Sequence, residues 1–138
     1  MNDIDIELDS RLTQFGETVT EYLEGKDIVE SLLQAKEDPE ELRIRMTKVA
    51  LSRRKIRAML TSMNKLLRSA SDNSVREQAI ALFSFLNTIG LREELEVIQQ
   101  MRKSGLLFNS NELDSYEREI NLMIKQISSI LDEVEKNI

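Results

Sequence analysis

The sequence predicts an all-α protein, a helical bundle of about five or six helices with long heptad-patterned (coiled-coil-like) helices. Glycine and proline are scarce, with 4 and 1 among 138 residues, and this composition favours helices over sheets. Apolar residues recur at steps of three and four along most of the chain. With 41% hydrophobic residues, the chain is long enough for one core and too short for two ordinary domains.

The N-terminal part predicts an acidic arm followed by two helices. In residues 1–9, isoleucine and leucine alternate with acids, and we expect a flexible arm there, with one helical domain over residues 10–138. A short extended strand is the alternative, although no second strand candidate exists to pair with it. Further on, Gly25 and a capping box of Asp27 and Glu30 predict that the first helix breaks and restarts.

The clearest helix start is Asp38 followed by Pro39, an N-cap acid and a proline at the first helical position. We expect a long helix over residues 39–70, which would span about 45 Å at roughly 1.5 Å per residue. Its apolar residues alternate at steps of four and three, except that Arg53 occupies a position assigned to the core. A helix of this length indicates an elongated rod or a helical bundle.

Arg53 admits two interpretations. We favour a position slightly displaced from the core, from which the guanidinium reaches solvent. The alternative is a buried or interfacial arginine that pairs with an acid and sets register or partner choice. Under that hypothesis Arg53→Leu would be neutral or stabilising for the fold and would relax oligomer specificity.

The second half of the chain predicts further helices. Ser74 and Glu77 form a second capping box, and the helix that follows is apolar on nearly every side, as in a buried element or a face awaiting a partner. Gly90 predicts a stop or kink, and Gly105 suits a C-terminal cap. Residues 109–111 are Asn, Ser and Asn, and offer N-caps for a final heptad-patterned helix.

The charges are segregated along the chain. Residues 1–41 carry a net charge of -10, residues 42–76 a net of +9, and residues 77–138 a net of -5. The basic segment coincides with the long helix, where five bases share one stripe beside the apolar face. This stripe comprises Arg43, Arg54, Arg57, Lys65 and Arg68.

Three interpretations of the basic stripe remain open. We favour ion pairs with acidic helices of the same bundle, while phosphates of a nucleic acid bound by helix 42–70, or an acidic protein or anionic membrane surface, are alternatives. No aromatic residue interrupts this helix to stack on a base, and the acidic remainder of the chain opposes a polyanion.

A candidate apolar interface lies later in the chain. It comprises Phe83, Phe85, Leu86 and Phe108. Bulky aromatic anchors concentrate at interface centres, and the alternative is that these side chains simply fill the core. The expected partner is another protein or a second copy of this chain, in a homodimer or higher oligomer.

No catalytic signature is present, and we expect neither an enzyme nor a cofactor. The chain lacks cysteine and histidine, which excludes disulfides, thiolate metal sites and histidine bases. Acids three residues apart could hold Mg²⁺ for a phosphohydrolase, a third and distant possibility. Such pairs occur at Glu21/Glu24, Asp38/Glu41, Glu93/Glu96, Asp114/Glu117 and Asp132/Glu135.

The sequence therefore predicts a non-catalytic protein-protein interaction or regulatory module that acts through helical packing, with nucleic-acid association as the alternative. No stretch of the sequence approaches 18 uninterrupted apolar residues, so we expect no transmembrane segment. The acidic first residues differ from the basic start of a signal or transit peptide, and we expect a cytoplasmic protein.

Overall fold

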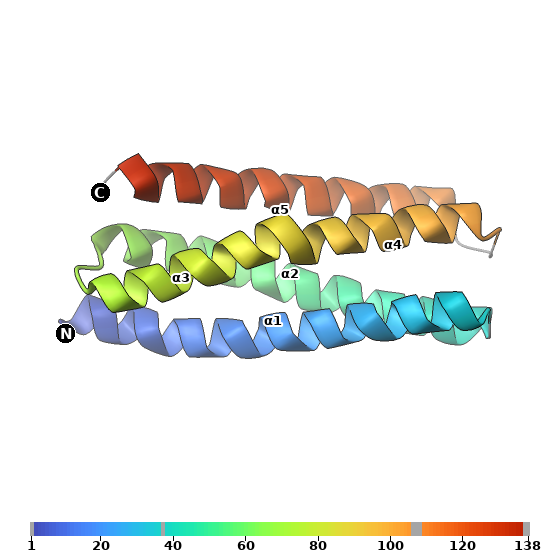
Figure 1. The fold of residues 1–138 in the computed structure, drawn as a ribbon, viewed down its shortest axis with the longest axis horizontal. Coiled ribbons are helices and arrows are strands. Elements are labelled where there is room, and N and C mark those ends of the chain that lie inside the picture. Colours follow the sequence, from blue (N-terminus) through green and yellow to red (C-terminus); the bar gives the residue numbers. More distant parts are fainter. Residues whose placement is uncertain (1, 37, 106–108, 137–138) are drawn as a thin grey trace.

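The computed structural model describes residues 2–36, 38–105 and 109–136 (Figure 1). Its helices are α1 (Asp3–Ala35), α2 (Pro39–Ser69), α3 (Asn73–Phe85), the π-helical turn η1 (Leu86–Gly90), α4 (Leu91–Lys103) and α5 (Ser110–Lys136). Within these residues no strand occurs, which confirms the all-α class. The elements α3, η1 and α4 follow one another without a gap, so the described residues form four rods rather than five or six separate helices.

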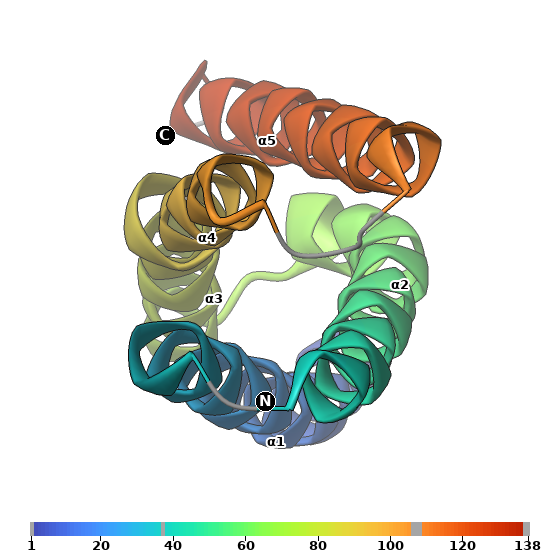
Figure 2. The same ribbon diagram turned by 90° about the vertical axis from the view of Figure 1, so that its right-hand side faces the viewer.

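The four rods run alternately in opposite directions, with α1 and the α3–α4 rod in one direction and α2 and α5 in the other (Figure 1). Viewed from one end, they enclose the core in the order α1, α2, α5 and α3–α4 (Figure 2). The helix α2 therefore has α1 on one side and the parallel α5 on the other. One face of α2 is left to solvent.

The helix ends follow local capping chemistry. The Asp38 side chain accepts a hydrogen bond from the amide of Glu40, and Pro39 opens α2, as predicted. Gly105 has φ of 68° after the end of α4, the left-handed conformation typical of a C-terminal glycine. The capping box predicted at Ser74 is wrong, because Asp72 accepts from the amide of Val75 and begins α3 two residues earlier.

The break predicted near Gly25 does not occur. The helix α1 passes through Gly25 because buried residues continue at steps of three and four on both sides of it, from Leu8 to Leu33. A Cβ added to Gly25 would lie 3.3 Å from Cγ2 of Val49. The glycine marks a close approach of α1 to α2 rather than a helix end.

Gly90 lies inside the third rod and does not stop it. The spacing of buried residues shifts by one residue between α3 and α4. Ala79 and Leu86 are seven residues apart, and the same interval would next bury position 93, but the structure buries Glu94. A π-helical turn holds one extra residue, about 100° of α-helical rotation. The turn η1 thereby brings both apolar stripes to the same side of the rod, and Gly90 approaches Tyr22 and Leu23 of α1.

The segment expected to be an arm belongs to the bundle. Residues 3–9 form the first turns of α1, with Asp5 and Leu8 buried. The Asp5 carboxylate accepts hydrogen bonds from the amides of Ser71 and Asp72 at 2.9 and 3.1 Å and from the Ser71 hydroxyl at 3.0 Å. Burial opposes the ionisation of Asp5, but these hydrogen bonds outweigh it and lower its pKa. The carboxylate joins α1 to the α2–α3 connection.

Replacing Asp5 by Asn should flatten the acid side of the pH–stability profile. A lowered pKa contributes stability that is present above the ordinary value of 3.8 and is lost as the pH falls through the folded-state value. Urea unfolding measured from about pH 6 to about pH 2 should show a shallower loss for Asp5→Asn than for the parent chain. The same change at the exposed Asp3 is the control, and an equal effect there would contradict the assignment.

Substitutions of Gly16 and Gly90 should have opposite effects on the free energy of unfolding, because Gly16 has room for a side chain and Gly90 does not. A Cβ at Gly16 would meet only Leu82, at 3.9 Å, whereas one at Gly90 would meet Leu23 at 3.3 Å and Leu86 at 3.4 Å. Gly16→Ala should raise the free energy of unfolding by about 0.5–1 kcal/mol. Gly90→Val, which adds bulk to the contact, should lower it by about 1–3 kcal/mol in urea titrations.

Candidate functional site

The centre of the bundle holds a buried ion network rather than a purely apolar core. The guanidinium of Arg53 in α2 donates through Nε and Nη2 to the two oxygens of Glu94 in α4, at 2.9 and 3.2 Å, and through Nη1 to Glu119 in α5, at 2.8 Å. The Tyr22 hydroxyl of α1 donates to Glu94 at 2.6 Å, and the Tyr116 ring lies 5.4 Å from Cζ of Arg53. All four rods contribute a side chain.

Arg53 and Glu119 of the network keep their charges in the folded state. Burial alone would lower the pKa of Arg53, but the charge and hydrogen bonds of Glu94 and the charge of Glu119 raise it. Burial raises the pKa of Tyr22 well above its ordinary value, and the Glu94 carboxylate raises it further. Burial would raise the pKa of Glu119, but hydrogen bonds and charge from Arg54 and Arg53 lower it.

Arg53 therefore does not reach solvent, and the interpretation that we favoured from sequence is wrong. Its side chain is fully buried, because each of its three nitrogens has a carboxylate partner inside the bundle. The ion pairs agree with the alternative hypothesis, while the setting of oligomer specificity stays a prediction.

A second buried charge accompanies the first. Nζ of Lys26 in α1 lies 3.0 Å from Glu93, 3.3 Å from Asp27 and 3.7 Å from Glu30. Burial opposes the charge of Lys26, but these partners raise its pKa. The sequence analysis missed Lys26 and Glu94. Lys26 continues the buried positions of α1, and Glu94 lies between Leu91 and Ile98 at steps of three and four.

The predicted basic stripe follows the seam between α2 and α5. Three of its members pair with α5 acids that lie seven and then fourteen residues apart, namely Arg43 with Glu112 at 3.5 Å, Arg54 with Glu119 at 3.0 Å, and Arg68 with Glu133. Arg57 and Lys65 are exposed and have no ion pair among the described residues. The expected pairing with an acidic helix of the bundle holds for three of the five bases.

The predicted apolar interface is divided by the fold. Phe83 and Leu86 are buried, and the Phe83 ring meets Phe15 edge to face with centroids 5.2 Å apart. Phe85 remains 41% exposed on the outside of the third rod. Phe108 lies outside the described residues. For Phe83 and Leu86 the core interpretation is correct, so they are not available to a partner.

The carboxylate pairs do not converge on a metal site. Across the described ranges, no group of three or more acids is arranged to hold a metal ion. Asp114 and Glu117 both pair with Arg102, and Glu93 pairs with Lys26. In the described part of the chain, no helix is both long enough and apolar enough to span a lipid bilayer.

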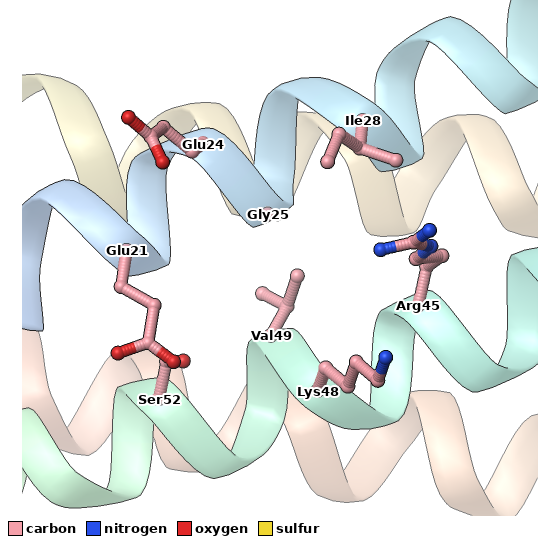
Figure 3. Close-up of a pocket in the computed structure, with 8 residues that line it drawn as sticks. All are labelled: Glu21, Glu24, Gly25, Ile28, Arg45, Lys48, Val49 and Ser52. Carbon is pink, nitrogen blue, oxygen red and sulfur yellow. The ribbon is translucent and has the colours of Figure 1, made fainter.

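A hollow opens on the surface between α1 and α2 (Figure 3). Its volume is about 230 Å³, with acids of α1 towards one end and bases of α2 towards the other. Gly25 presents no side chain to it, and Val49 of α2 packs close to the α1 backbone there. The lining residues are Glu21, Glu24, Gly25, Ile28, Arg45, Lys48, Val49 and Ser52.

A second hollow continues along the same seam. It measures about 530 Å³ and shares Glu21, Lys48 and Ser52 with the first. Its other lining residues are Leu51, Arg54, Lys55 and Ala58, all on α2. The two hollows together form a groove that runs from the α1–α2 seam onto the outer side of α2.

The solvent face of α2 carries an apolar line at seven-residue spacing, which the sequence analysis did not single out. Ile44 is 53% exposed and Leu51 is 52% exposed, and Ala58 continues the line. Lys48 and Lys55 flank it on the α1 side and have no ion pair within the described ranges. We call Ile44, Lys48, Leu51, Lys55 and Ala58 the outer face of α2.

Removing Arg53 alone should destabilise the fold strongly. Arg53→Leu leaves the fully buried Glu94 without its cation, which should lower the free energy of unfolding by about 3–5 kcal/mol in urea titrations. This replaces the neutral outcome expected from sequence. The double variant Arg53→Leu/Glu94→Leu should recover most of the loss, because both buried charges are removed together. A double variant no more stable than Arg53→Leu would contradict this account.

Comparison of the chain with protein-family models, with curated proteins and with solved structures finds no match.

Proposed function

We propose that this protein is a non-catalytic interaction module that binds a partner protein through the outer face of α2. The observation that carries the proposal is the exposed apolar line of Ile44, Leu51 and Ala58 beside Lys48 and Lys55. Single exposed apolar residues are ordinary on protein surfaces. A line of three on one helix face, with Leu51 and Ala58 lining a surface hollow, combines exposed apolar side chains with a concave surface, as interaction sites do.

Packing within the bundle does not account for this face. Three bases on the α5 side of α2 have acidic partners in α5, whereas Lys48 and Lys55, like Arg57 and Lys65, have no ion pair within the described ranges. The buried stripe of the same helix already supplies its contribution to the core, from Leu42 to Leu67. The outer residues are therefore free to serve recognition.

Nucleic-acid binding by helix 42–70 stays the alternative. The exposed Lys48, Lys55, Arg57 and Lys65 would support it, because unpaired bases can displace counterions from phosphates. The pairing of Arg43, Arg54 and Arg68 with α5 weighs against it, as does the lack of an aromatic side chain on α2. A cytoplasmic location and self-association, for instance through Phe85 and Ile89, are also proposals.

Photocrosslinking at two equally exposed leucines tests the proposal. Benzoylphenylalanine placed at Leu51, which is 52% exposed, should form adducts with a distinct protein in cells that express the chain, while the same group at Leu122 of α5, 51% exposed, should not. The protein captured at Leu51 should bind the purified chain, and Leu51→Asp should abolish that binding. Nuclease-sensitive adducts would favour the alternative, and equal adducts at both sites would contradict a specific face.

A further inference from the structure

We infer that the partner binds as an acidic amphipathic α-helix lying along the α1–α2 seam, with apolar side chains in the two hollows and carboxylates against Lys48 and Lys55. This rests on the proposed function and specifies the chemistry of the partner.

The spacing of the hollows suits successive anchors of one helix. The α2 residues that line them centre about four to five positions apart, on the order of 7 Å along the helix axis. Side chains at i and i+4 of a bound helix are about 6 Å apart along its axis. A groove that receives anchors at i, i+4 and i+7 is the usual mode for recognising an amphipathic helix.

The lining of the hollows favours apolar anchors with charged flanks. Ile28 and Val49 line the first hollow, and Leu51 and Ala58 line the second. The second hollow exposes more apolar than polar surface. The outer apolar line repeats every seven residues, the interval at which a helix laid along α2 returns to the same face.

The charges on the two sides of the seam, which we call the α1 bank and the α2 bank, determine which charged residues a bound helix can carry on each of its flanks. The α2 bank carries Arg45, Lys48 and Lys55, and the α1 bank carries Glu21 and Glu24. In Figure 3 the side chains of Glu21 and Glu24 lie towards one end of the first hollow, and those of Arg45 and Lys48 lie towards the other. A bound helix can place carboxylates against the bases of α2 and place bases or amides against the acids of α1.

The same charges disfavour a uniformly anionic partner. A phosphodiester chain or an anionic membrane surface presents negative charge to both banks, so the carboxylates of Glu21 and Glu24 would repel it. A helix of mixed polarity avoids this repulsion. The two banks therefore favour a folded peptide over a polyanion.

A designed probe peptide tests the inference. The probe is a fluorescein-labelled helical peptide of about three heptads, with leucines at i, i+4 and i+7, glutamates on one flank and glutamines on the other. Fluorescence anisotropy with the full chain should show saturable binding. Lys48→Glu/Lys55→Glu should weaken it by at least about tenfold, and Leu51→Asp by a similar factor, where tenfold is about 1.4 kcal/mol.

Matched controls exclude a general charge effect. Arg57→Glu/Lys125→Glu makes the same change in net charge at exposed positions outside the groove and should alter binding by less than about threefold. A scrambled peptide of the same composition should not bind, nor should a peptide with lysines in place of the glutamates. Circular dichroism should show all the variants folded, because the changed residues are exposed.

The outcomes separate this inference from the proposed function. Equal binding of the lysine peptide, or full binding by Lys48→Glu/Lys55→Glu, would overturn the acidic helix. Tighter binding of phosphatidylserine vesicles or single-stranded DNA, lost in that double variant, would also overturn it. If Leu51 crosslinks a specific protein and the probe peptide does not bind, the interaction module stands and the helical partner is rejected. If both experiments fail, both are rejected.

Discussion

A guanidinium with no exposed surface needs carboxylates within hydrogen-bonding distance, and Arg53 finds them on the adjacent rod α5 and on the α3–α4 rod across the core (Figure 2). Glu94 of α4 takes two of its nitrogens and Glu119 of α5 takes the third, while Tyr22 of α1 donates to Glu94. Hydrogen bonds of this kind depend on distance and angle, whereas apolar contacts tolerate sliding. The network therefore fixes the lengthwise position of each rod relative to the others.

The π-helical turn is the local adjustment that this network requires. Without the extra residue, the α4 stripe would turn by about 100° relative to α3, and position 93 would face the core instead of position 94. In the structure Glu94 reaches Arg53, and Glu93 is left at the α1 side, where Lys26 pairs with it. One inserted residue thus gives two adjacent glutamates separate cationic partners.

Parallel packing of α2 against α5 decides which bases remain for recognition. Glu112, Glu119 and Glu133 lie seven and then fourteen residues apart along the α5 side of the seam and pair with Arg43, Arg54 and Arg68. Within the described residues, no ion pair joins α2 to α1. The outer face of α2 consequently keeps uncompensated lysines beside exposed apolar side chains, and this asymmetry underlies the proposed docking of an acidic helix.

The sequence by itself determined the helical class, the long helix after Asp38, its cap and the cap at Gly105, because propensity, periodicity and capping act over a few neighbouring residues. It also marked Arg53 as an anomaly in the apolar stripe. In the third rod, the apolar stripe slips by one residue between Leu86 and Leu91, and this slip is a local signal for the π-helical turn that was not predicted.

Only the tertiary structure decided the partners of Arg53, the continuity of α1 through Gly25 and the division of Phe83 from Phe85. Each depends on which rod lies beside which, and Glu94 is 41 residues from Arg53 in the chain. Helix periodicity shows which side of a helix is buried, but not what it is buried against. The groove along α1 and α2 arises from two exposed faces set side by side, so it exists only once the bundle has formed.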